Sequence, residues 1–118
     1  MIERIKRIYR YYFKNPPKVK VTKKDKVIRL GSVYGGWDLV PSNINKDSII
    51  YSFGIGEDIS FDLAMIEKFN CKVYGFDPTP RVSSWLKKQN VNNNFIFTPV
   101  GLATYDGSIE FYKPTNEQ

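Results

Sequence analysis

Two glycines and three acidic residues stand where the chain could hold a small ligand. The segment 52–58, SFGIGED, ends one apolar run, and Asp77 ends the next one, VYGF at 73–76. Asp77 follows Gly56 by 21 residues, about the offset at which an acid binds the hydroxyl pair of a ribose. Ligands of open parallel sheets bind beyond the carboxyl ends of the strands. The spacing therefore favours a ligand that contains a nucleoside.

The charges at this corner limit which nucleoside ligand could bind there. A dinucleotide fingerprint needs a third glycine at position 59, where Ile59 stands. Glu57 and Asp58 put negative charge at the helix end that a pyrophosphate would need. S-adenosylmethionine has a ribose and an adenine but no phosphate, and its sulfonium and ammonium groups are cationic. The acidic corner therefore predicts S-adenosylmethionine as the cofactor.

A simpler interpretation of the same residues stays open. Acids in the first turn of a helix complement the helix dipole in many proteins that bind nothing there. Asp77 could serve only to cap the turn before Pro78.

The elements expected around these residues form an α/β unit. Apolar runs predict strands at 27–32, 48–53, 71–76 and 95–103, the last with a break at Pro99. Helical spacing predicts helices at 2–14, 58–69 and 80–89, the last with Thr79 as N-cap and Pro80 at its first position. Asp106-Gly107 predicts a hairpin between 101–105 and 108–112. Strand and helix alternate from 48 to 98, which implies parallel pairing.

Composition excludes several classes of protein. The 118 residues suffice for one domain and are 42% hydrophobic. No run reaches the length of a membrane span, and the N-terminus has no signal-peptide core. A single cysteine, Cys71, fits the reducing cytoplasm. The absence of histidine excludes Ser-His and Cys-His catalysis and the usual zinc sites, so we expect no metal.

Charge divides the chain into two predicted parts. Residues 1–29 hold eleven Lys/Arg and two acids, whereas residues 30–118 hold seven Lys/Arg and ten acids. The first part is a basic helix and arm that could bind nucleic acid or an anionic membrane surface. We favour a helix that packs its Ile/Tyr stripe and leaves its charges in water, so nucleic acid is not an expected partner. Trp37, after Gly35-Gly36, either flanks a pocket or, as is more common, lies in the core.

Residues 30–118 resemble the FkbM-type methyltransferases, which are class I enzymes dependent on S-adenosylmethionine. The resemblance rests on VYGGW (33–37), IIYSFGIGEDISFD (49–62), VYGFDPTPR (73–81) and FIFTPVGLATYDGSIEFYKP (95–114). It implies that Gly54 and Gly56 lie behind the methionine moiety, Asp77 holds the ribose, and Gly101-Leu102 lies near the adenine. The whole predicted cofactor site is Ser52, Phe53, Gly54, Gly56, Glu57, Asp58, Asp77, Pro78, Gly101 and Leu102.

The resemblance implies a Rossmann-like class I methyltransferase fold with a parallel sheet that is incomplete here. Ser52 stands where the common motif has an acid, and the fourth strand, with a motif resembling K-x-D-x-E-G, is missing. Residues 30–118 would then be the cofactor-binding half of an enzyme that methylates a hydroxyl of a glycan or small molecule. The catalytic residues stay unassigned, with Tyr34, Asp38 and Glu57 the first to test. Strand 48–53 should present an unpaired edge that favours self-association.

Two other functions remain open. The chain could be a nucleoside-binding module without chemistry, or an adaptor that binds nucleic acid or a membrane surface through its basic arm.

Overall fold

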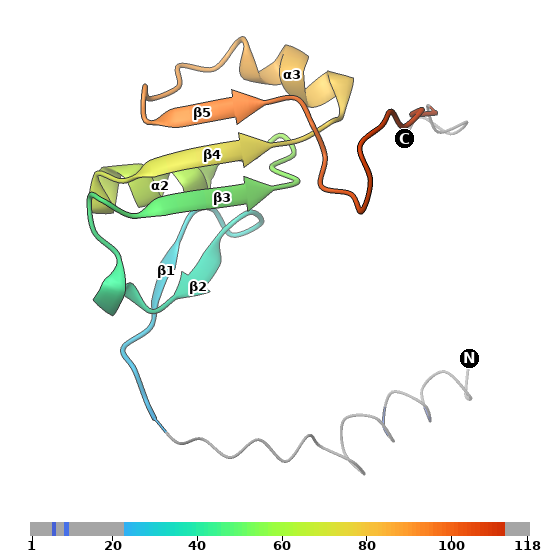
Figure 1. The fold of residues 1–118 in the computed structure, drawn as a ribbon. Coiled ribbons are helices and arrows are strands. Elements are labelled where there is room, and N and C mark those ends of the chain that lie inside the picture. Colours follow the sequence, from blue (N-terminus) through green and yellow to red (C-terminus); the bar gives the residue numbers. More distant parts are fainter. Residues whose placement is uncertain (1–5, 7–8, 10–22, 113–118) are drawn as a thin grey trace.

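The protein, seen in a computed structural model, is a mixed α/β structure described for Lys6, Tyr9 and residues 23–112 (Figure 1). A three-stranded parallel sheet has the order β3-β4-β5, and a separate antiparallel pair joins β1 and β2. The strands are β1 (Ile28–Leu30), β2 (Trp37–Leu39), β3 (Ile49–Phe53), β4 (Lys72–Phe76) and β5 (Phe95–Thr98). The helices are the 3-10 turn η2 (Pro41–Asn43), α2 (Ser60–Phe69) and α3 (Pro80–Leu86).

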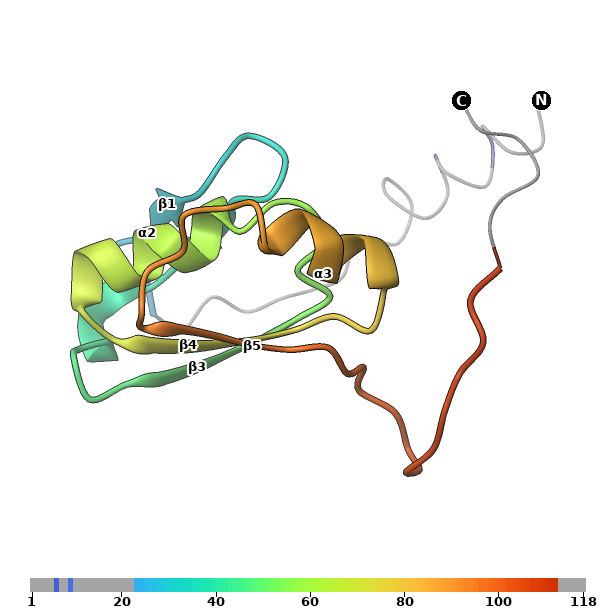
Figure 2. The same ribbon diagram turned by 90° about the horizontal axis from the view of Figure 1, so that it is seen from above.

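The two helices cover the same face of the parallel sheet. Helix α2 connects β3 to β4, and α3 connects β4 to β5, so both crossovers move in the same direction across the sheet. Such crossovers are right-handed, which places both helices on one side. Figure 2 shows α2 and α3 above the sheet, with no described helix below it. The predicted parallel pairing is confirmed.

Alternation along the strands separates a core face from an open face. Ile50 and Ser52 of β3 pair with Val73 and Gly75 of β4 in the register and point toward the helices. The core is the set Ile55, Ile59, Met65, Ile66, Cys71, Val73, Val82, Leu86 and Phe95. Cys71 is thus a buried core residue, as its position at the start of an apolar strand suggested.

The helix termini follow local side-chain chemistry. Helix α2 begins at Ser60, two residues later than expected, because the Asp58 carboxylate accepts a hydrogen bond from the Ser60 N–H and forms a turn there. It ends at Phe69, and the next residue, Asn70, caps it in the left-handed conformation with φ 53°. Helix α3 has Thr79 as N-cap and Pro80 at its start, as predicted, but ends at Leu86 and reaches Gln89 only as turns.

Three expectations about strands were wrong. The strand predicted at 95–103 ends at Thr98, before Pro99. No strand was predicted between residues 33 and 47, but Trp37–Leu39 forms β2 and pairs with Ile28–Leu30. The hairpin predicted at 101–112 is absent, since these residues form no strand and run away from the sheet (Figures 1 and 2). A two-stranded hairpin is marginal alone, and this segment pairs with no strand of either described sheet. Its apolar side chains, such as Leu102 and Tyr112, are exposed.

The predicted basic helix at 2–14 lies almost wholly outside the described residues. Lys6 and Tyr9 are described, and both are helical and exposed. Within the described part of the chain, no helix has the length and apolar character needed to cross a bilayer.

Candidate functional site

An open cavity of about 720 Å³ lies at the carboxyl end of β3. Three parts of the chain form its walls: the end of β3 with the glycine corner, the first turn of α2, and the loop between β1 and β2. Arg81 of α3 completes it. Its lining residues are Tyr34, Gly35, Trp37, Ser52, Phe53, Gly54, Ile55, Gly56, Glu57, Asp58, Phe61, Asp62 and Arg81.

The two corner glycines leave the cavity open. Gly54 has φ +70° and Gly56 has φ +58°, conformations that side chains disfavour. A Cβ built on either glycine would meet no atom within 4 Å, so protein packing does not fill the space in front of them. Gly75 is different, because a Cβ there would lie 2.5 Å from the Phe95 ring. The corner glycines therefore face free volume, whereas Gly75 is a packing glycine.

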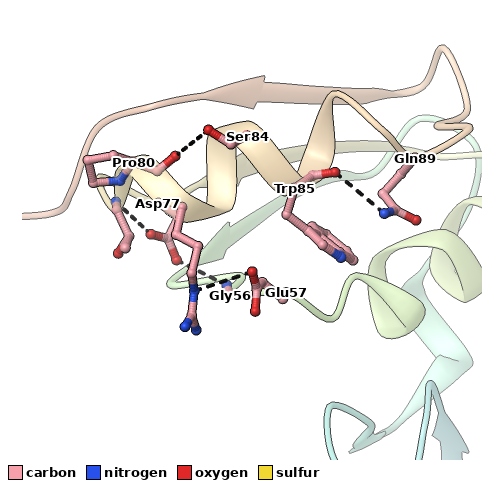
Figure 3. Close-up of polar contacts among 9 residues, drawn as sticks. Gly56, Glu57, Asp77, Pro80, Ser84, Trp85 and Gln89 are labelled. Atoms are coloured by element: carbon pink, nitrogen blue, oxygen red, sulfur yellow. Dashed lines mark hydrogen bonds and ion pairs between the residues drawn. The ribbon is translucent and has the colours of Figure 1, made fainter. Parts of the chain in front are cut away.

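Asp77 fixes the shape of this corner. Its carboxylate accepts hydrogen bonds from the Gly56 N–H at 3.0 Å and from the Thr79 N–H at 2.9 Å (Figure 3). Burial raises the pKa of Asp77, but the bonds from Gly56 and Thr79 outweigh burial and leave the pKa below its ordinary value. Asp77 is buried and does not line the cavity. The bond from Thr79 is the turn cap that the simpler interpretation expected. The bond from Gly56 in addition joins the end of β4 to the glycine corner.

Asp58 anchors the loop between β1 and β2. The Ser32 hydroxyl donates to Asp58 at 2.6 Å and accepts from the Gly35 N–H at 2.8 Å. The Ser32 N–H donates to the Ser60 hydroxyl at 2.7 Å. The hydrogen bonds from Ser32 and then Ser60 lower the pKa of Asp58. This network fixes the backbone of Gly35, next to Tyr34, at the cavity wall.

Glu57 has a cationic partner within the site. Its carboxylate lies 3.3 Å from the Arg81 guanidinium, and the Arg81 side chain is largely exposed. Figure 3 shows Glu57 beside Gly56 and Asp77, at the end of the sheet where α3 begins. An ion pair this exposed contributes little to folding. It does balance one of the negative charges around the cavity.

Asp62 is the acid that sequence reasoning missed. It is the third residue of α2, lines the cavity and is only 3% exposed. Among the described residues, its Oδ1 atom has no hydrogen-bond partner. Burial raises the pKa of Asp62, and a hydrogen bond with the Ser52 side chain lowers it in part. Asp62 follows Asp58 by four residues, a spacing that could have revealed a shared helix face.

The structure brings together six of the ten predicted site residues. Ser52, Phe53, Gly54, Gly56, Glu57 and Asp58 line the cavity, whereas Asp77, Pro78, Gly101 and Leu102 do not. A Cβ on Gly101 would lie 3.1 Å from the Pro78 ring, so these two residues adjoin each other beyond the cavity lining.

Of the three residues named as possible catalytic groups, two line the cavity and one does not. Tyr34 and Glu57 line the cavity, but Asp38 pairs with Arg29 at 3.4 Å and is not part of the lining. Trp37 also lines the cavity and is 68% exposed, so the expectation that it lies in the core was wrong. The described residues contain no group of three or more His, Cys, Asp or Glu side chains that could hold a metal ion.

The arrangement can therefore accept a ligand that approaches the glycine backbone and meets acids and aromatic rings. Comparison of the chain with protein families, curated proteins and solved structures gives no match.

Proposed function

We propose that residues 30–118 are the S-adenosylmethionine-binding half of a methyltransferase domain with a Rossmann-like class I fold. The observation that carries the proposal is the pair of left-handed glycines, Gly54 and Gly56, whose missing side chains leave a cavity open at the carboxyl end of β3. Ligands of parallel α/β sheets bind at this end, where the strand order reverses. Strand β3 is an edge of the described sheet, next to which such a reversal would place the next strand.

The composition of the cavity supports a cationic nucleoside over a phosphate. Three carboxylates, Glu57, Asp58 and Asp62, and one cation, Arg81, line it. Tyr34, Trp37 and Phe53 add exposed aromatic surface, on which an adenine can stack or a sulfonium can rest. The volume of about 720 Å³ lies within the usual range for small-molecule sites.

Asp77 can still bind a ribose hydroxyl, but only with an acceptor position that its own contacts leave free. A carboxylate has about four acceptor positions, and the backbone bonds from Gly56 and Thr79 and the bond from the Thr79 side chain account for three of them. We propose that a ribose hydroxyl reaches a remaining position when the ligand enters. The lowered pKa of Asp77 keeps it ionised and ready to accept.

The proposed reaction is methyl transfer to a hydroxyl of a glycan or small molecule in the cytoplasm. When bound, S-adenosylmethionine supplies an electrophilic methyl group. The residues of this chain bind and orient it: the glycine corner admits it, and the loop anchored by Asp58 forms one wall of the cavity.

Titration calorimetry with S-adenosylhomocysteine tests the proposal. Gly56→Ala should weaken binding by at least about tenfold, since a methyl group would project into the ligand space. Asn70→Ala is the matched control, because it also puts alanine at a left-handed position (φ 53°) but lies at the far end of α2. Wild-type protein that does not bind, or a folded Gly56→Val variant that binds normally, would refute the proposal.

A nucleoside-binding module without chemistry is the second candidate. Asp38 favours this candidate. It was named as a possible catalytic residue, but it pairs with Arg29 away from the cavity. Methyl transfer by the 118-residue chain to a hydroxyl acceptor would exclude this module. Binding to RNA or anionic vesicles without S-adenosylhomocysteine binding would instead favour the basic-arm adaptor.

A further inference from the structure

One carboxylate in the cavity, that of Asp62, has an oxygen without a hydrogen-bond partner among the described residues. Glu57 pairs with Arg81, and Asp58 accepts from Ser32 and Ser60. Asp62 is only 3% exposed, and its Oδ1 atom has no hydrogen-bond partner among the described residues. A buried acceptor without a donor is costly, and native proteins keep few of them. This cost is relieved if a ligand supplies the donor.

The side chains described around Asp62 supply one donor, the Ser52 hydroxyl, and Asp62 itself lines the cavity. The Ser52 hydroxyl of β3 interacts with the carboxyl, but it has only one hydrogen to donate. Asp58, one turn earlier, is negatively charged and raises the pKa of Asp62. Arg81, the cation of the lining, is paired with Glu57.

The chemistry of an unpaired carboxylate oxygen selects one part of the proposed ligand. A sulfonium is cationic but has no hydrogen to donate, whereas an ammonium offers three N–H donors and a charge. A metal ion would want several oxygen ligands, and the described residues form no such group. An amine is therefore the group that satisfies Asp62 in both charge and hydrogen bonding.

We propose that Asp62 binds the ammonium group of the amino-acid moiety of the ligand and thereby selects S-adenosyl amino acids over simple nucleosides. This inference rests on the proposed function, since it concerns the same cavity. Asp62 lies on the first turn of α2 and Gly56 on the corner before it, so one short segment would contact the amino-acid moiety of the ligand.

Three ligands test this role by calorimetry at neutral pH. S-adenosylhomocysteine has the ammonium group, its deaminated analogue lacks only that group, and 5′-methylthioadenosine lacks the whole amino-acid moiety. In wild-type protein, loss of the ammonium should weaken binding by at least about tenfold. Asp62→Asn should weaken S-adenosylhomocysteine to a similar extent and leave 5′-methylthioadenosine within about twofold. Glu67→Gln is the matched control, because Glu67 is an exposed acid of the same helix that does not line the cavity.

Stability separates binding from a structural role. Replacing a buried, unpaired carboxylate by an amide of the same shape should keep or raise the melting temperature of the free protein. Asp62→Asn that weakens all three ligands equally, or lowers the melting temperature, would overturn the inference. So would wild-type protein that binds the deaminated analogue as tightly as S-adenosylhomocysteine, and this comparison needs no variant. Wild-type protein that binds none of the ligands would refute the proposed function itself.

Discussion

The two faces of the parallel sheet have similar chemistry but different surroundings. On the face toward α2 and α3, Val73 and Phe95 are buried under Met65 and its neighbours. On the other face, Tyr51 and Phe53 are at least half exposed, and Phe53 stacks on Phe76 at 4.8 Å between ring centroids. Strands of parallel sheets are usually apolar on both faces because both are covered. The open face thus has the composition of a surface that another element covers.

This difference explains where the cavity lies. Both helices lie on one face because the strand order moves from β3 toward β5 without reversing. An element that covers the open face would have to add at the free edge of β3, beside the glycine corner. The candidate site therefore adjoins the one sheet edge at which such a reversal can occur among the described strands.

The largest contrast between the two faces should appear in stability. Met65→Ala removes a side chain that is 2% exposed and should lower the free energy of unfolding by about 3–4 kcal/mol. Tyr51→Thr, on the open face, should lower it by less than about 1 kcal/mol, since threonine suits a strand and Tyr51 is 62% exposed. Urea unfolding measures both losses, provided that the free energy of unfolding depends on urea concentration with the same slope in each variant. Equal losses would mean that the open face is covered in solution.

A smaller effect is expected where the glycine corner joins the sheet. Asp77→Ala leaves the Gly56 and Thr79 N–H groups without their acceptor and should lower the free energy of unfolding by about 2–3 kcal/mol at neutral pH. The pKa of Asp77 is lowered below 3.8 in the folded state, so the unfolded chain binds its proton more tightly. Its contribution is present above pH 3.8 and is lost as the pH falls through the folded pKa.

Urea unfolding of wild-type protein and Asp77→Ala across acidic pH tests this. The difference between the two should shrink as the pH falls below 3.8. A difference that stays constant would show that the carboxylate charge does not contribute.

The sequence predicted the central unit well because its signals are local and repeated. The apolar runs at 49–53, 72–76 and 95–98 and the helical spacing of 60–69 each fill one element. Three-residue β2 was missed because its pattern is too short to distinguish from a turn. The hairpin at 101–112 was predicted from Asp106-Gly107, but a turn signal does not supply the third strand or the packed helix that stabilises a hairpin.

The candidate site could be predicted only where it is continuous in sequence. Residues 52–58 form one corner and were identified together. Arg81 and the loop at 34–37 reach the cavity only through the packing of distant elements. Asp62 looked like an ordinary acid in the first turn of a helix. Its burial beside Ser52 follows from how α2 packs on β3, which no local pattern encodes.

The smallest change in stability is expected for a substitution at the free edge of β3, which tests whether two chains pair there. Its sequence, IIYSF, is uncharged, and within the described residues it pairs only with β4. We expect wild-type chains to associate through this edge. Ile49→Glu places a charge there, directly opposite Lys72 in the register, so the free energy of unfolding should change by no more than about 0.5 kcal/mol.

Analytical ultracentrifugation over a range of concentrations measures this association. Ile49→Glu should shift the protein toward the monomer, because a second chain would have to bury the new carboxylate. Ile49→Val is the matched control, since it keeps the edge uncharged and suited to a strand. If the wild-type chain stays monomeric at every concentration, the free edge does not pair between copies. The open aromatic face would then need a partner other than a second copy of this chain.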